Sequence, residues 1–376
     1  MLYITFNDAP SGIYFSQVTA VCEYMEVELN TKMRLIAFIS LRSFGKNRRA
    51  IRSEYKQATV VPMFPTMLTW RWNSITLALL LLFGSRKACI SRGPYATWLA
   101  LCLKKAGLIS TVCFDARGAY KAELNEYTVV TSPILKEGIA HLEADVLHRS
   151  DFRIAVSESL VTYWEREFDY RLDKHVVIPC TLHKRFLDPI SPEDQLNVLR
   201  KNMHIEKEDI LIAYSGSNAG WQSFSAVKTF LAVQLKNNSR LKIVFMSKEI
   251  PEGLEEDEVF RSRFIRKWVE PAEVRSLLCI CDYGLIIREA SVTNLVSSPV
   301  KFAEYLACGL HVLISEAIGD YPAFVEQHQC GQVVHDLNTP LQLCKGTYTG
   351  KEKLHDLATR NFSKNTFRES YKRLIA

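Results

Sequence analysis

Residues 297–315, with the sequence SSPVKFAEYLACGLHVLIS, predict a short helix that leads into a buried strand. Ser298 is a good N-cap and Pro299 a good first helical residue. Gly309 suits the position just beyond the end of the helix, and the apolar run that follows it suits a strand inside a sheet. A helix and a strand in direct succession are typical of α/β domains.

The same predicted helix carries a cation and a carboxylate near its start. Its apolar residues Phe302, Tyr305 and Leu306 share one face and should be core, whereas Lys301 and Glu304 share another edge. A helix start attracts phosphate through its free N–H groups and its partial positive charge, so a bound anion would explain a lysine there. Glu304 would then accept hydrogen bonds from sugar hydroxyls. An ordinary surface Lys–Glu pair is the alternative, and it stays open.

Strand-like segments alternate with helical segments along the whole chain. The strand-like segments are apolar almost throughout, which indicates a parallel sheet that is covered on both faces. They are residues 2–6, 33–40, 88–93, 111–118 and 153–158 in the first half and 210–217, 241–247, 283–289 and 311–315 in the second.

A stretch with three prolines and little periodicity, residues 176–195, separates the two sets and predicts a connector. We therefore expect an α/β protein with two tandem, doubly wound, Rossmann-like domains that face a central cleft, residues 1–180 and 181–360. Residues 361–376 predict a helix that packs back on the first domain. Ligands of such open sheets bind beyond the carboxyl ends of the strands, so the loops there hold the candidate sites.

The composition is that of an ordinary globular protein, with 48% hydrophobic and 23% charged residues. The net charge of +6 suits anionic ligands or a membrane surface, but it is too small to indicate nucleic acid as a partner. The 10 scattered cysteines include no C-x-x-C pair, which indicates a reducing cytosol and gives no zinc spacing. The first residues do not predict a signal peptide.

Two segments bear on membrane contact. Residues 42–56 hold the densest basic run of the chain, and we expect a solvated loop there rather than a lipid-contacting patch. Residues 75–83, ITLALLLLF, are too short to span a bilayer, which needs about 20 apolar residues. We expect them to form a core helix, with an interfacial segment as the alternative.

Residues 297–315, followed by IGD at 318–320, resemble the donor-binding signature of bacterial retaining glycosyltransferases of the two-Rossmann (GT-B) type. These are family-4-like, group 1 enzymes of envelope polysaccharide synthesis. Three earlier segments resemble the family more weakly and occur in the same order as in its members. They are SGIYFSQV at 11–18, FDARG at 114–118 and YSGSNAGWQ at 214–222. Together they cover most of the chain. Many relatives carry a glutamate eight residues before the one that matches Glu304, and this sequence has Val296 there.

The resemblance implies a role for each domain and for its site residues. Residues 1–180 would form the acceptor-side domain and residues 181–360 the nucleotide-sugar donor domain. Asp115 would orient or deprotonate an acceptor hydroxyl, and Arg117 would grip an anionic group, with an internal salt bridge as the alternative. The residues that would bind the donor are Gly12, Ser215, Gly216, Ser217, Arg288, Ser297, Ser298, Lys301 and Glu304.

The activity that the resemblance implies is transfer of a hexose from a nucleotide sugar to a glycan or lipid-linked acceptor, in capsule or lipopolysaccharide synthesis. Such an enzyme would be cytoplasmic, with peripheral contact at the inner face of the plasma membrane. The sequence has no D-x-D motif, so we expect neither a metal nor another cofactor. A nucleotide-sugar epimerase of the same fold and a catalytically degenerate scaffold in an envelope-synthesis complex are the alternatives.

Overall fold

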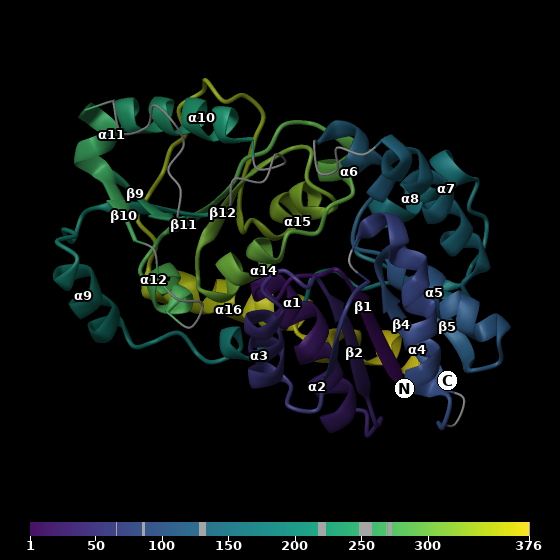
Figure 1. The fold of residues 1–376 in the computed structure, drawn as a ribbon. Coiled ribbons are helices and arrows are strands. Elements are labelled where there is room, and N and C mark those ends of the chain that lie inside the picture. Colours follow the sequence, from purple (N-terminus) through teal and green to yellow (C-terminus); the bar gives the residue numbers. More distant parts are fainter. Residues whose placement is uncertain are drawn as a thin grey trace. The chain divides into compact units, whose positions relative to one another are not determined.

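Two parallel β-sheets organise the chain in the computed structural model, which describes residues 1–64, 66–84, 87–127, 133–216, 223–247, 258–267, 269 and 273–375. The contacts divide the chain into two units (Figure 1). Unit 1 consists of Met1–His183 and Lys364–Ala376, and unit 2 of Lys184–Ser363. The expected pair of Rossmann-like α/β domains is confirmed.

Unit 1 is built on a seven-stranded sheet with the order β3-β2-β1-β4-β5-β6-β7. Every pair in it is parallel, and β1 lies between β2 and β4. The predicted strand segments all form strands, whereas the short β3 and β7 were not predicted. The strands are β1 Leu2–Phe6, β2 Arg34–Ile39, β3 Thr59–Pro62, β4 Lys87–Arg92, β5 Ile109–Asp115, β6 Phe152–Ala155 and β7 His175–Val177.

Helices connect these strands and cover the sheet. They are α1 Gly12–Tyr14, α2 Ala20–Val27, α3 Phe44–Glu54, α4 Asn73–Leu81, α5 Gly93–Lys105, α6 Tyr120–Glu126, α7 Pro133–Arg149, α8 Glu158–Phe168 and α17 Arg368–Arg373. The π-helix Phe15–Thr19 joins α1 to α2, and the 3-10 helix Met67–Trp72 leads into α4.

The C-terminal segment packs on unit 1, as expected. Tyr371 of α17 belongs to the same core cluster as Tyr3 and Ile90. Its ring centroid lies 5.5 Å from that of Tyr24 on α2. The last helical stretch is not continuous, however, because α16 ends at Phe362 and the 3-10 helix Lys364–Phe367 precedes α17. Figure 1 shows both chain termini at this part of unit 1.

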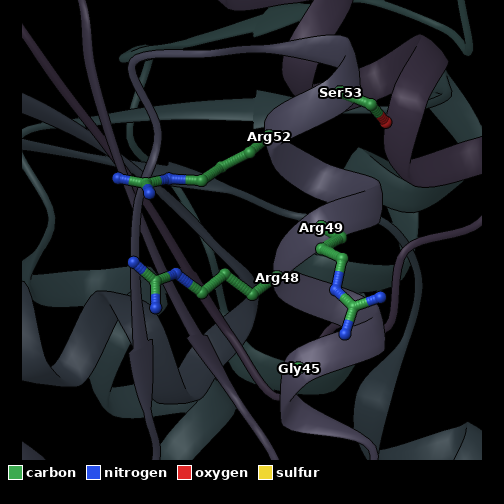
Figure 2. Close-up of a pocket in the computed structure, with 5 residues that line it drawn as sticks. All are labelled: Gly45, Arg48, Arg49, Arg52 and Ser53. Atoms are coloured by element: carbon green, nitrogen blue, oxygen red, sulfur yellow. The ribbon is translucent and has the colours of Figure 1, made fainter.

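Two expectations for unit 1 are wrong. The basic run does not form a loop, since Lys46, Arg48, Arg49 and Arg52 lie on helix α3, where their side chains are exposed. Figure 2 shows Arg48 and Arg52 extending to one side of this helix and Arg49 to the other. These arginines line a surface hollow of ≈ 460 Å³. Phe44 and Ile51 lie seven residues apart and therefore on one face of a helix, where both pack against the core of unit 1.

The apolar residues 75–83 do not form a core helix either. They lie on α4 and the turn after it, but of these residues only Leu77 and Leu81 are buried. Ile75, Leu79, Leu82 and Phe83 are exposed. One helix can turn only one face toward a sheet, so a run that is apolar all round leaves its other face outside.

Unit 2 is built on a six-stranded parallel sheet with the order β10-β9-β8-β11-β12-β13. Its predicted strands are confirmed, and β10 and β13 were not predicted. The strands are β8 Ile210–Ser215, β9 Leu241–Met246, β10 Phe264–Arg266, β11 Tyr283–Ile286, β12 His311–Ser315 and β13 Gly331–Val334. The helices are α9 Glu193–Asn202, α10 Phe224–Asn237, α11 Glu258–Arg263, α12 Val274–Cys279, α13 Val292–Leu295, α14 Val300–Ala307, α15 Tyr321–His328 and α16 Tyr348–Phe362.

Within the part of the chain that the structure describes, no helix is both long and apolar enough to cross a membrane.

Candidate functional site

Most of the predicted donor residues lie at the carboxyl edge of the unit 2 sheet. Strand β11 lies between β8 and β12, with Gly284 opposite Ala213 and Ile286 opposite Ile314. Because all three strands are parallel, the residues that follow them meet at one edge of the sheet. Ser215 ends β8 and Gly216 follows it, and Arg288 follows β11.

Helix α14 follows β11 in the chain and begins on the same side of the sheet. It runs from Val300 to Ala307, and Phe302, Tyr305 and Leu306 are fully buried, as the sequence predicted. Gly309 follows the C-cap Cys308 with φ of +78°, the left-handed conformation expected of a residue just past a helix end.

The start of α14 differs from the prediction by one residue. Pro299 is the N-cap, so Ser298 does not cap the helix. The hydroxyl of Ser298 instead lies 2.7 Å from the hydroxyl of Tyr321, which fixes the loop against helix α15. A proline has no N–H to contribute to a helix, which suits it to the very start and makes the cap and first-turn positions hard to separate by sequence.

A hydrogen bond ties α14 to the end of β8. The hydroxyl of Tyr305 accepts from the backbone N–H of Ser215 at 3.1 Å. The tyrosine ring lies directly over Gly284 of β11, where an added Cβ would overlap it. Gly216 is required in the same way, because a Cβ there would overlap the hydroxyl of Tyr214. The backbone of β8 and the helix therefore have a fixed relative position.

A buried asparagine organises the loop before α14. Asn294 is fully buried, and its side chain donates to the carbonyl of Glu289 at 3.0 Å and accepts from the guanidinium of Arg288 at 3.2 Å. The backbone N–H of Arg288 donates to the hydroxyl of Ser315 at 3.0 Å, and that hydroxyl donates back to the Arg288 carbonyl at 2.9 Å. Arg288 is thus held at both its backbone and its side chain.

Ser297 stabilises the same loop. Its hydroxyl donates to the carbonyl of Asn294 at 2.8 Å, and that carbonyl also accepts from the backbone N–H of Gly319 at 3.1 Å. A Cβ on Gly319 would overlap the Ser297 carbonyl, so the loop after β12 packs closely on this turn. The structure therefore gives Ser297 a positioning role in the loop.

Lys301 and Glu304 lie half-buried next to further charged groups. Burial and the nearby Arg288 lower the pKa of Lys301 to about 7, against a smaller opposing effect of Glu304. Burial raises the pKa of Glu304 to about 7, and the positive charges of Arg185 and Lys301 oppose that rise. The ammonium group of Lys301 lies 6.0 Å from the centroid of the Tyr214 ring. Two cations, Lys301 and Arg288, are thus brought together beside the end of β8, an arrangement that an anion would stabilise.

The predicted catalytic pair lies in unit 1, at the end of β5. Asp115 is fully buried and accepts a hydrogen bond from the hydroxyl of Tyr3 at 2.5 Å. Its other partners are Arg117, with Nε 2.9 Å from Oδ1, and Arg92, with a guanidinium nitrogen 3.8 Å from Oδ2. Arg92 also pairs with Asp8 at 2.7 Å. These contacts favour the internal salt bridge over a carboxylate that touches an acceptor.

Two predicted donor residues remain, Gly12 and Ser217. Gly12 belongs to unit 1, where it begins α1 after the N-cap Ser11, and an added Cβ would meet nothing there. Ser217, together with Trp221 and Gln222 of the same predicted loop, lies outside the described residues.

Sequence reasoning missed Arg185 and Ser315 as parts of the site, and it gave no individual role to Asn294 in the loop before α14. Arg185 lies in the 3-10 helix Lys184–Phe186, more than a hundred residues before the glutamate whose pKa it affects. The amide of Asn294 and the hydroxyl of Ser315 bind backbone groups of the site loop. A polar residue at the end of a predicted strand was the one available signal for Ser315.

Among the residues that the structure describes, no group of three or more His, Cys, Asp or Glu side chains is placed to hold a metal ion.

No protein-family model matches this chain, and no curated protein does either. Solved structures do resemble it over its whole length. An Anabaena protein, Alr3699/HepE in complex with UDP, has a TM-score of 0.71 and 11% identity over 99% of this chain and 98% of its own. A glycosyltransferase from Rickettsia africae ESF-5 has a TM-score of 0.71 and 13% identity, over 99% of this chain and 97% of its own.

The chain has the GT-B fold. WaaG, a glycosyltransferase involved in lipopolysaccharide biosynthesis, supports the same conclusion, with a TM-score of 0.61 and 11% identity over 100% of this chain and 94% of its own. At such low identity, the similarity of these GT-B proteins extends to the fold and not to a substrate.

Proposed function

We propose that this chain is a glycosyltransferase that moves a hexose from a nucleoside diphosphate sugar, in particular a UDP-sugar, to a glycan or lipid-linked acceptor of the cell envelope. We also propose that the reaction retains the anomeric configuration, needs no metal and takes place in the cytoplasm. The support from relatives is that HepE has been solved with UDP, and with UDP and glucose, and that WaaG acts in lipopolysaccharide synthesis.

The observation that carries the proposal is the pair of cations at the start of α14. Arg288 lowers the pKa of Lys301 and so its preference for the charged form, and Lys301 is half-buried. A diphosphate placed between them and the first N–H groups of α14 would relieve this repulsion. The absence of a side chain at Gly216 leaves room for the hydroxyl of Tyr214, whose ring centroid lies 6.0 Å from the ammonium group of Lys301.

The same groups suit the chemistry of transfer. When the bond between the sugar and the diphosphate breaks, negative charge grows on the leaving diphosphate. Cations and N–H groups that are already in position stabilise that charge without having to reorganise. Lys301, Arg288 and the helix start of α14 are therefore the proposed leaving-group site, and Glu304 is the proposed hydrogen-bond acceptor for the ribose hydroxyls.

On the acceptor side, we propose that Arg117 and Arg92 contact the acceptor and that Asp115 positions them. Their side chains are 13% and 10% exposed, whereas that of Asp115 is 0% exposed. One buried carboxylate between two guanidinium groups holds both in place, and guanidinium groups suit a phosphate-bearing acceptor.

Incubation of the purified protein with UDP-sugars and an extract of bacterial envelope glycolipids tests the proposal. We expect UDP to accumulate as the sugar moves to the glycolipid fraction, and the Lys301→Met variant to release little UDP. Conversion of the sugar to an epimer that stays linked to UDP would identify the epimerase instead. An unchanged UDP-sugar would support the scaffold.

The pKa values predict a pH dependence of donor binding. Lys301 loses its proton and Glu304 becomes ionised as the pH rises through about 7, and both changes disfavour an anion. Because the bound diphosphate raises the pKa of Lys301, binding should take up a proton. We expect the affinity for UDP-glucose to fall about tenfold from pH 6 to pH 8. UDP-glucose itself does not titrate in this range, so isothermal titration calorimetry at the two pH values measures the protein's contribution.

Replacement of Glu304 with alanine should separate the ribose from the diphosphate. We expect about tenfold weaker binding of UDP and little change for inorganic pyrophosphate, which has no ribose. The matched control is Glu326→Ala, which removes an exposed carboxylate of helix α15 in the same unit. Unchanged affinity for UDP in the Glu304→Ala variant would overturn the assignment of Glu304.

A further inference from the structure

The segment formed by the 3-10 helix Met67–Trp72 and helix α4 has two apolar faces. One face packs into unit 1 through Trp70, Leu77 and Leu81, which are all buried. The amide of Asn73 fixes the segment further, since it accepts from the backbone N–H of Phe64 at 2.7 Å and donates to the carbonyl of Trp70 at 2.8 Å. The segment is therefore anchored as a rigid helix along one side.

The opposite face forms an exposed apolar stripe. Its residues follow one another at alternating spacings of four and three, which places them in one row along the helix. Each side chain is between 52% and 63% exposed, and Phe83 at the end of the row is fully exposed. The apolar stripe consists of Leu68, Trp72, Ile75, Leu79 and Leu82.

An exposed row of this kind marks an interaction surface. Single exposed apolar residues are normal on proteins, but contiguous apolar patches mark contacts with proteins or membranes. The stripe also has an aromatic residue toward each end, with Trp72 near one and Phe83 at the other. Aromatic side chains gather where a membrane meets water.

The charged residues in this span of the chain favour an anionic partner. The sequence has no Asp or Glu between Glu54 and Asp115, so every charged residue in this span of the chain is a cation. Arg71 is exposed beside Trp72, with its guanidinium carbon 5.4 Å from the centroid of the Trp70 ring. Lys87 begins the next strand.

A second copy of the chain fits this surface poorly. In paired helices with such a row, opposite charges along the flanks favour the pairing. Two copies would instead bring two Arg71 side chains together without a carboxylate from this segment. A bilayer with anionic lipids matches both features. The acyl-chain boundary accommodates the apolar stripe, and the negative headgroups attract the cations.

The basic helix α3 is not part of this contact. It connects β2 to β3 toward the edge of the sheet, whereas α4 lies on the connection that returns from β3 to β4. Because such connections are right-handed, the two helices cover opposite faces of the sheet. Ile51 of α3 accordingly packs in the core cluster with Val18 and Val21.

We propose that the apolar stripe, with Phe83, is a monotopic membrane-docking surface that inserts into the headgroup region of an anionic bilayer. The helix then lies in the plane of the membrane with Arg71 at the level of the phosphates. Neither the stripe nor its cations belong to the proposed donor site, so the inference stands apart from the proposed function.

Co-sedimentation of the full chain with vesicles tests the proposal. The vesicles are pure phosphatidylcholine, or phosphatidylcholine with about one third phosphatidylglycerol. The test variant is Trp72→Ser/Leu79→Ser/Phe83→Ser. The control is Val27→Ser/Val198→Ser, which removes apolar side chains that are 71% and 59% exposed on other helices.

We expect the unmodified chain and the control to bind the anionic vesicles at least tenfold better than the neutral ones, and the test variant to lose about 100-fold in partition coefficient. Thermal denaturation verifies folding of the variants, and Phe83→Ser alone serves if the triple variant melts early. No binding to anionic vesicles, equal binding to both kinds of vesicle, or undiminished binding of the variant would overturn the proposal. A dimer in light scattering that the triple variant converts to a monomer, without vesicle binding, would assign the stripe to a second copy.

Discussion

Replacement of Asp115 with asparagine should lower the free energy of unfolding by about 3 kcal/mol or more. The carboxylate is fully buried between Arg117, Arg92 and the hydroxyl of Tyr3. Asparagine keeps the shape but removes the negative charge, which leaves two guanidinium groups next to each other with only Asp8 to compensate them. Buried charges that lose their partner are among the most destabilising changes known.

Chemical denaturation followed by tryptophan fluorescence measures this loss, with the transition of unit 1 fitted separately if the two units unfold apart. The control is Asp145→Asn, which breaks the exposed pair with Arg149 on helix α7 and should cost less than about 1 kcal/mol. A variant Asp115→Asn that is as stable as the unmodified chain but transfers sugar slowly would contradict the positioning role. It would support the catalytic carboxylate that the sequence predicted.

Replacement of Lys301 with methionine should weaken the binding of UDP-glucose and of inorganic pyrophosphate by about 100-fold, because a charged hydrogen bond to phosphate is worth about 1.5–3 kcal/mol. The same change should not destabilise the fold. Burial and Arg288 lower the pKa of Lys301 from 10.5 to about 7, so its positive charge is unfavourable in the folded state below pH 10. Methionine removes that unfavourable charge and keeps the length of the side chain.

Titration calorimetry measures the affinities, and the variant should also lose most of the pH dependence between pH 6 and 8. Lys236→Met is the control, because it removes an exposed lysine of helix α10 in the same unit. A Lys301→Met variant that binds pyrophosphate as well as the control does would show that the anion site lies elsewhere.

The fold could be predicted because its central strands are apolar almost throughout, which is the pattern of strands that are buried on both faces of a parallel sheet. The strands that were missed, such as β7 and β10, have only three residues and lie at sheet edges. Tertiary pairing rather than local sequence creates them. Helix α4 was placed in the core because its composition is apolar all round, and composition does not tell which face meets the sheet.

The candidate site could be predicted where its parts lie close in the sequence. Lys301 and Glu304 are one turn apart on α14, so their proximity follows from helix geometry. The proximity of Arg288 and Arg185 depends on how three separate segments fold together. No local pattern encodes such contacts, and none encodes the buried partners of Asp115.

Thermal stabilisation of the purified protein by UDP-, GDP- and dTDP-sugars, with and without EDTA, tests the central claim most directly. A ligand at about 100 times its dissociation constant should add roughly 2.7 kcal/mol of stability. We predict a shift that is largest for UDP-sugars, survives EDTA and disappears in the Lys301→Met variant. The absence of a shift with every nucleotide sugar, or an equal shift in that variant, would contradict a diphosphate site at the start of α14.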